Sequence, residues 1–195
     1  MTAQISDIAT YSNTEYDIVG LNGEGLFNPY EYKLNPVGSC TACWRGYMVG
    51  YLVKDDRLYA DMLRINLEKP AKLKFWKKWP PDINGHRPDK PGDADFELFD
   101  YTWSNLQIPL TFTGGLLLGN DFIHDLYVHM GFQDPWKYRE VHEFVFDKGK
   151  LTKHQDVSEK MKQYRDMVEK GTGSPKGYDS LEAWINDCFS LSYRI

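Results

Sequence analysis

The residues best suited to acid–base or metal chemistry in this sequence cluster between positions 121 and 129. They are Asp121, His124, Asp125 and His129. On a helix, residues three and four positions apart share a face, so the first three of these side chains would lie together. Carboxylates combined with imidazoles can bind a divalent metal or transfer protons in catalysis. The pattern is therefore compatible with a metal-assisted hydrolase that uses Asp121, His124 and His129, although ordinary surface or core positions carry the same residue types.

A Cys-x-x-Cys pair at Cys40 and Cys43 suggests two further kinds of chemistry. A redox pair needs its first thiol at a helix N-terminus, and a zinc site needs two more Cys or His ligands at short spacing. An alternating apolar run follows Cys43 within a few residues, and Cys188 is distant in the sequence. Because free cysteines are often small buried residues, the pair is interpreted as packing at the start of a strand.

Arg45 follows directly and is a candidate ligand-binding residue. Its guanidinium could bind an anion, whereas pairing with a carboxylate or stacking on Trp44 is the structural alternative and the favoured one. Gly46 is predicted to permit close approach of another part of the chain.

A candidate partner-binding segment interleaves cations with aromatic rings at Phe75, Trp76, Lys77, Lys78 and Trp79. Such interleaving suits nucleic-acid bases or a membrane interface. The net charge of −5 and the pI near 5.5 argue against nucleic acid, and no apolar run approaches the ~20 residues that span a bilayer. Tryptophan is a frequent anchor of protein interfaces, so the segment predicts another protein as partner. The alternative is that the rings fold onto the core and leave the lysines in solvent.

The elements that must position these residues are mainly strands. Apolar alternation and turn residues predict hairpins over 47–67, 110–118 and 141–151. Residues 121–130 fit either a helix or a strand, and a short helical turn followed by extended chain is favoured. Capping boxes that begin at Asp156 and Asp179 predict two C-terminal helices.

These elements predict an α+β fold. Its antiparallel, hairpin-rich sheet would form either a sandwich or a barrel, with the two C-terminal helices packed against it. A chain of 195 residues fits a single domain over 1–195. Five prolines between positions 69 and 95 predict a loop or insertion there, because proline removes donors from strand ladders.

The Thr-x-Cys-Trp-Arg-Gly-Tyr run from Thr41, its alternating strand, and the Gly-Phe-x-x-Pro-Trp-Lys-Tyr run from Gly131 resemble bacterial proteins that are uncharacterised. The resembling parts are 41–67 and 113–158. The resemblance implies a bacterial cytosolic origin and carries no activity.

The sequence contains no phosphate-binding loop, dinucleotide fingerprint, nucleophile elbow or His-Glu-x-x-His motif. No secretory signal is recognised at its start. We therefore predict a cytoplasmic, non-enzymatic protein-binding module of inhibitor or immunity type, with no cofactor and no nucleic-acid or membrane partner. The metal-assisted hydrolase and a small-ligand binder with an aromatic-lined pocket remain as alternatives.

Overall fold

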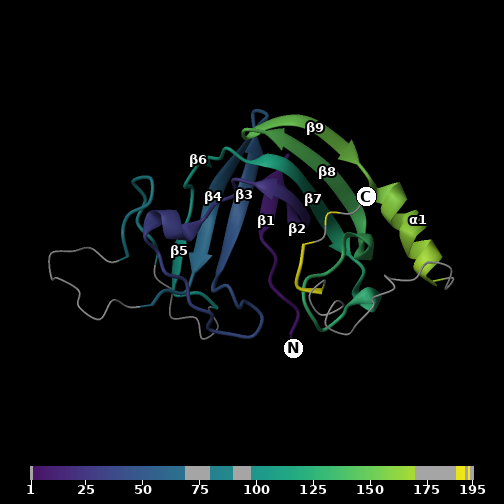
Figure 1. The fold of residues 1–195 in the computed structure, drawn as a ribbon, viewed down its shortest axis with the longest axis horizontal. Helices are drawn as coiled ribbons and strands as arrows, with labels where there is room; N and C mark the ends of the chain where they lie inside the picture. The colour runs from purple at the N-terminus through teal and green to yellow at the C-terminus, as the bar shows by residue number, and fades with distance from the viewer. Residues whose placement is uncertain (1, 69–79, 90–97, 170–187, 192, 194–195) are drawn as a thin grey trace.

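Seven strands of the chain close into a barrel. The computed structural model describes residues 2–68, 80–89, 98–169, 188–191 and 193, and strands make up 46% of it. Around the barrel the order is β3 (Tyr47–Lys54), β1 (Ile8–Tyr11), β2 (Thr14–Glu24), β7 (Thr113–Phe122), β8 (Tyr138–Asp147), β9 (Lys150–Asp156) and β4 (Arg57–Ile65), which pairs with β3 again (Figure 1). The short strands β5 (Tyr101–Trp103) and β6 (Ile108–Pro109) extend the sheet from β4.

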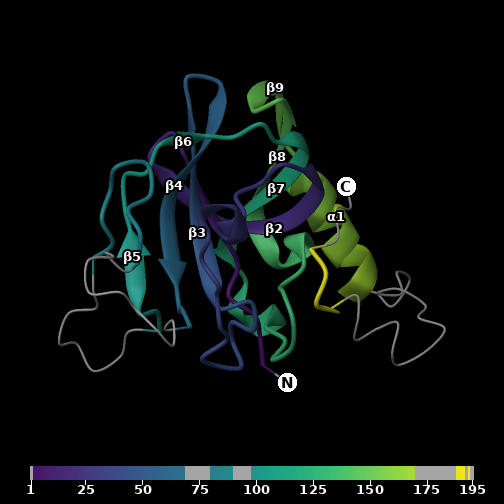
Figure 2. The same ribbon diagram turned by 60° about the vertical axis from the view of Figure 1, so that its left-hand side comes forward.

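The barrel closes through extensive pairing on one side of β4 and through a single residue pair on the other. β3 and β4 pair along their whole lengths, and β1 pairs with β3 in parallel, whereas the other pairs are antiparallel. β4 meets β9 at a single pair, Arg57 with Lys150. Beyond that pair β9 curves away from β3 and β4 (Figures 1 and 2). β9 is exposed along most of its length, and this includes His154 on the same face as the buried Phe144.

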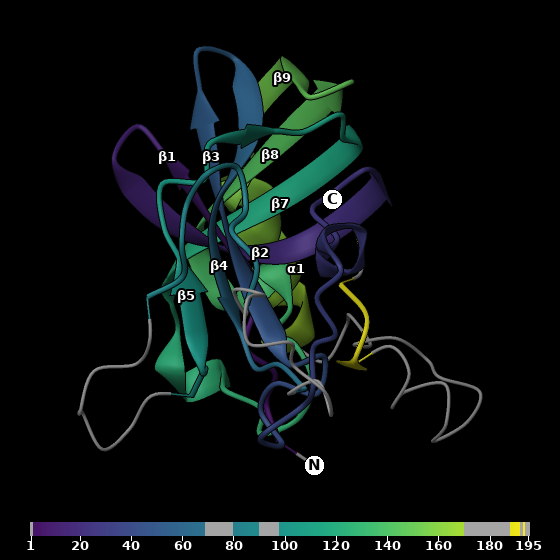
Figure 3. The same cartoon turned by 90° about the vertical axis from the view of Figure 1, so that its left-hand side faces the viewer.

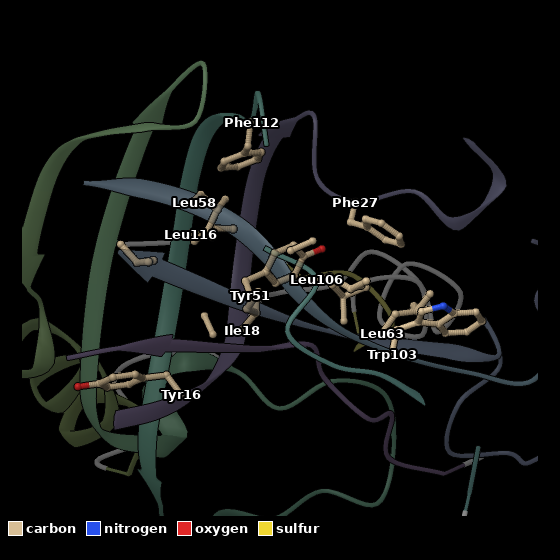
Figure 4. Close-up of a cluster of buried hydrophobic side chains, with 14 of the residues drawn as sticks. Tyr16, Ile18, Phe27, Tyr51, Leu58, Leu63, Trp103, Leu106, Phe112 and Leu116 are labelled. Atoms are coloured by element: carbon tan, nitrogen blue, oxygen red, sulfur yellow. The ribbon is translucent and has the colours of Figure 1, made fainter. Parts of the chain in front are cut away.

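The inward-facing side chains form the main hydrophobic core (Figure 4). Successive residues of a strand point to opposite faces, so alternate positions of each strand enter this core. On β7, for example, Leu116 and Leu118 face inward and Leu117 faces outward. The largest fully buried side chains of the core include Trp103, Phe112, Phe144, Phe146, Leu58 and Leu63.

The helix α1 (Ser158–Glu169) covers part of the outer face. Its first turn begins where Asp156 accepts a 2.8 Å hydrogen bond from the Ser158 amide, as the capping pattern predicted. Val157 and Met161 pack with Leu117 and Val141 in a second, outer cluster. Figure 3 shows α1 behind the barrel wall. Three short 3-10 turns complete the described elements: η1 (Pro29–Tyr32), η2 (His124–Leu126) and η3 (Pro135–Lys137).

Two of the predicted hairpins are confirmed and one is wrong. β3–β4 and β8–β9 form as expected, with Asp55, Asp56 and Lys148 in left-handed turn conformations. The hairpin over 110–118 does not form, because β7 runs straight through the Thr113-Gly114-Gly115 segment and pairs with β2 and β8. The two glycines lie against neighbouring strands instead of forming a turn.

The predicted α+β class with two C-terminal helices on a sheet is wrong. The chain is mostly β, and a barrel with one α-helix replaces that arrangement among the described residues. The second predicted helix, from Asp179, lies largely in 170–187, outside the described residues. Sequence patterning identified the strands of two hairpins but did not show that β4 pairs with both β3 and β9. Most of the 69–95 segment is likewise not described, and its assignment as an insertion stays a prediction.

Truncating the core should destabilise the barrel strongly. Leu116 is fully buried, so Leu116→Ala should lower the free energy of unfolding by about 2–5 kcal/mol through lost burial and a residual cavity. The exposed helix residue Lys162 offers the control, since Lys162→Ala should change it by less than about 0.5 kcal/mol. Urea denaturation measures both. Equal, small effects would mean that position 116 is not in the core.

Candidate functional site

A pocket on the outer wall of the barrel is the candidate site. It has a volume of about 470 Å³ and lies where the N-terminal segment crosses β2, the end of β7 and the η2 loop. The Gln4 backbone amide donates a 2.7 Å hydrogen bond to the Gly131 carbonyl, which joins the N-terminal segment to the loop after η2. The pocket combines aromatic, apolar and polar side chains, and its lining residues are Ala3, Gln4, Ile5, Ser6, Ile8, Asp17, Met48, Phe122, His124, Tyr127, Gln133 and Tyr138. This volume and this mixture are typical of small-molecule sites.

Asp17 is the acidic group of the pocket. It lies on β2 between the inward-facing Tyr16 and Ile18, so the strand alternation turns it outward. The Tyr138 hydroxyl donates a 3.0 Å hydrogen bond to Asp17 Oδ2. Burial raises the pKa of Asp17, and the Tyr138 hydrogen bond only partly opposes this. Burial and the adjacent carboxylate raise the pKa of Tyr138 far above its usual value, so its hydroxyl remains a donor.

Gly119 makes room for the Tyr138 ring. A Cβ atom at position 119 would lie 2.8 Å from Tyr138 Cγ, closer than real Cβ contacts come. The absence of a side chain on β7 thus lets the ring lie flat against the strand and reach Asp17. Phe122 packs edge-on against Tyr138, with ring centroids 5.1 Å apart.

The η2 loop provides the opposite margin. The Gln133 side chain holds this loop by accepting a hydrogen bond from the Val128 amide and donating one of 2.7 Å to the Val128 carbonyl. Lys137, almost fully buried, donates to Gln133 Oε1 at 3.0 Å. His124 and Tyr127 both make edge contacts with the Phe122 ring. The loop side of the pocket is therefore held by side-chain hydrogen bonds and ring packing.

A buried ion pair holds the N-terminal margin. Asp7 accepts two hydrogen bonds from the Arg45 guanidinium, one of them 2.9 Å long, and a 2.6 Å bond from the Val49 amide. Arg45 Nε also donates to the Tyr47 carbonyl at 2.8 Å. Burial raises the pKa of Asp7, and the Arg45 charge opposes that shift. The ion pair fixes the segment before β1 onto β3, which places Ile5, Ser6 and Ile8 in the pocket wall.

Arg45 therefore has the structural role that was favoured from the sequence. Its donors are engaged by Asp7 and Tyr47 instead of facing the pocket. Gly46 has φ of 74°, and a Cβ there would lie 2.3 Å from the Val37 carbonyl oxygen, so the predicted close approach is confirmed.

The structure does not gather the four residues predicted for metal or acid–base chemistry. Asp121 pairs with Arg139 at 2.9 Å in an exposed ion pair, and His129 Nδ1 lies 3.0 Å from the Tyr127 hydroxyl. Asp125 is exposed, and of the four only His124 lines the pocket. The expected helical turn at η2 followed by extended chain is confirmed, but it is too short to align these side chains. Among the described residues, no three His, Cys, Asp or Glu side chains are grouped to hold a metal.

The predicted partner-binding residues Phe75, Trp76, Lys77, Lys78 and Trp79 lie outside the described residues. The assignment of this segment to a protein interface stays a prediction.

The early cysteines are placed as the packing interpretation expected. Cys43 is buried in a small cluster with Met48 and Phe99, and its thiol lies 3.3 Å from the Tyr47 carbonyl. Burial raises the pKa of the Cys43 thiol, which disfavours the reactive thiolate. A turn joins the two cysteines, with the Cys43 amide bonded to the Cys40 carbonyl.

Sequence reasoning missed Asp17, Gln133 and Tyr138. For Asp17 a signal existed, because the run Tyr16-Asp17-Ile18-Val19 places one acidic residue among three apolar or aromatic ones. For Tyr138 and Gln133 no local pattern indicates a site. Tyr138 on β8 reaches Asp17 on β2 across the one intervening strand β7, and the two residues are 121 positions apart in sequence.

Breaking the Asp7–Arg45 pair should destabilise the protein far more than breaking an exposed pair. Arg45→Ala leaves a buried carboxylate without its cation and should lower the free energy of unfolding by about 3–5 kcal/mol. Arg139→Ala removes the exposed partner of Asp121 and should lower it by less than about 1 kcal/mol. Chemical denaturation compares the two variants. Similar losses would contradict the assigned role of Arg45.

Asp17 should reduce stability when it is ionised. A carboxyl with a folded-state pKa above its unfolded value binds its proton more tightly in the folded protein, so its contribution to stability falls as pH rises through the two pKa values. Asp17→Asn lacks this titration. The free energy of unfolding of Asp17→Asn minus that of the wild type should therefore increase as the pH rises from about 3 to neutral. The increase should begin near the unfolded pKa of about 3.9.

Thermal unfolding of both proteins across this pH range measures that difference. The exposed variant Asp121→Asn serves as the control for the removal of one negative charge. A constant or falling difference for Asp17→Asn would show that Asp17 is not held in a desolvated site.

Comparisons with protein-family models, with curated proteins and with solved structures found no match to this chain. Within the described residues, none of the helices has the length and apolar character needed to cross a membrane. Functional conclusions therefore depend on the geometry of the chain's own residues.

Proposed function

We propose that the protein binds a small organic cation, an amine or ammonium compound, in the pocket around Asp17. The observation that carries this proposal is a desolvated carboxylate beside three aromatic rings in a pocket of about 470 Å³. This proposal corresponds to the small-ligand binder with an aromatic-lined pocket, which the sequence analysis kept as an alternative. The protein-binding alternative depends on residues 75–79, and the metal-assisted hydrolase depends on residues that the structure separates.

The charges favour a cationic ligand over an anionic one. Tyr138 binds Asp17 Oδ2, and among the described contacts no hydrogen bond reaches Oδ1. A ligand ammonium at Oδ1 would offset the cost of burying the carboxylate, as a paired charge does elsewhere in proteins. The net charge of −5 adds a weak long-range attraction for cations.

The aromatic rings favour an organic cation over a simple ion. Phe122, Tyr127 and Tyr138 line the same pocket. The face of an aromatic ring attracts an ammonium group and also buries the carbon atoms attached to it. Gln133 and His124 supply further polar atoms that can fix the orientation of a ligand.

The proposal places this ligand binder in the cytoplasm. It is supported by Cys40 and Cys43, which carry free thiols.

A thermal-shift screen tests the proposal. Primary, secondary and quaternary amines should raise the melting temperature of the wild-type protein in a concentration-dependent way, because a ligand that binds only the folded state stabilises it. Carboxylates and neutral isosteres of the same size should have no such effect. For the best amine, Asp17→Asn should weaken binding at least about tenfold, since the ion pair is lost.

Two further variants sharpen the result. Asp121→Asn removes one negative charge outside the pocket and should retain the wild-type response. Gly119→Ala displaces the Tyr138 ring and should weaken binding while keeping every charge. The proposal fails if no amine shifts the wild type, or if Asp17→Asn responds to amines as the wild type does.

A further inference from the structure

A chain of four polar side chains lies on the inner face of the barrel, from β2 across β8 to β9. The Tyr16 hydroxyl donates to Glu140 Oε1 at 3.1 Å, and His142 Nε2 lies 2.8 Å from the same oxygen. On the other side of its ring, His142 Nδ1 lies 3.2 Å from His154 Nε2. Figure 4 shows the Tyr16 hydroxyl pointing away from the hydrophobic residues labelled there. The Asp17 pocket contains none of these four residues.

The hydrogen bonds determine which nitrogen of His142 is available to a ligand. A carboxylate oxygen only accepts, so the ring proton of neutral His142 is on Nε2, where it is donated to Glu140. The lone pair is therefore on Nδ1 and points toward His154. Histidines that bind metals have this arrangement, with the far nitrogen bound to a carboxylate that orients the ring. Tyr16 in turn fixes Glu140.

The two facing nitrogens have the separation that a shared metal ion requires. Two nitrogens each about 2.0–2.1 Å from a tetrahedral zinc ion lie about 3.3 Å apart. The observed distance between His142 Nδ1 and His154 Nε2 is 3.2 Å. Both residues are on the same face of the β8–β9 hairpin, because His154 lies opposite Phe144 and His142 opposite Asp156.

The His154 ring is held in place although it is solvent-exposed. It stacks on Phe144 with centroids 4.4 Å apart, and the Tyr11 ring contacts it edge-on at 5.1 Å. A ligand that is already oriented loses little conformational entropy when the metal binds. Because His154 is exposed, an ion can reach its ring directly from solvent.

We propose that His142 and His154 bind one divalent transition-metal ion of the zinc, cobalt, nickel or copper class on the β8–β9 hairpin. Imidazole nitrogen suits these ions, whereas magnesium and calcium prefer oxygen ligands. The site has two protein ligands, and water fills the remaining positions. Asp156 lies nearby, but its Oδ1 accepts hydrogen bonds from Ser158, so it is a further ligand only after rotation.

The charged groups around the two histidines favour a cation. The neighbouring acidic groups, Glu140 and Asp156, would stabilise the added positive charge.

Isothermal titration of the metal-free, reduced full-length protein with zinc chloride tests the proposal. We expect one ion to bind per chain. His154→Ala should weaken binding at least about tenfold, and because His154 is exposed this variant should fold normally. Glu140→Gln keeps both ligands but removes the orienting carboxylate, and should weaken binding by about 10–100-fold.

Matched controls separate this site from the other zinc-binding side chains of the chain. A His124→Ala/His129→Ala double variant removes two of the other three histidines, and a variant with all three cysteines changed to serine removes the thiols. Both should bind zinc as the wild type does. With cobalt, the bound ion should show absorption bands of nitrogen and oxygen ligation without a thiolate charge-transfer band. The proposal is wrong if wild type binds no zinc, if His154→Ala binds like wild type, or if either control loses binding.

Discussion

The uneven closure of the barrel at β4 governs the rest of the structure. β4 pairs with β3 along eight register positions but meets β9 only through Arg57 and Lys150. On the tightly paired side, every inward residue is sealed into the core. On the other side, β9 has solvent on both faces, and inward positions such as His142 and His154 can carry polar groups without the desolvation penalty that the core imposes. One incomplete strand pair thus allows a hydrophobic core and a polar, accessible site on the same inner surface.

Tethering of the N-terminal segment is the second constraint. Asp7 and Arg45 join the residues before β1 to the start of β3, and the Gln4 amide then reaches Gly131 in the loop after η2. Three segments distant in sequence meet there because one charged pair is buried with its hydrogen bonds satisfied. The pocket around Asp17 is the space left between them. A buried ion pair contributes little net stability, and its role here is to fix geometry.

The sequence predicted local elements better than their assembly. The alternation in 47–67 and in 141–151 was sufficient for two hairpins, since the strand period and the Asp55-Asp56 and Lys148-Gly149 turns agree. The Thr113-Gly114-Gly115 segment was wrongly predicted to be a turn, because glycine also occurs where strands approach closely. Here Gly114 lies against Asn22 and Gly23. Asp17 and Tyr138 meet only after β2, β7 and β8 are paired, and no local pattern contains that information. The proximity of His142 and His154 could have been predicted from the sequence, because the predicted turn places them on adjacent arms of one hairpin.

The parallel pairing of β1 with β3 also affects the order in which the protein can fold. Ile8 pairs with Gly50 and Tyr11 with Val53, so the β1–β3 pairing cannot form until β3 has been synthesised. The hairpin of β1 with β2 can form earlier. The pairs β2–β7 and β4–β9 join segments still further apart along the chain. Contacts this non-local slow folding, because much chain entropy is lost before they form. In a chain emerging from the ribosome, β2 therefore lacks its second partner until β7 has been synthesised.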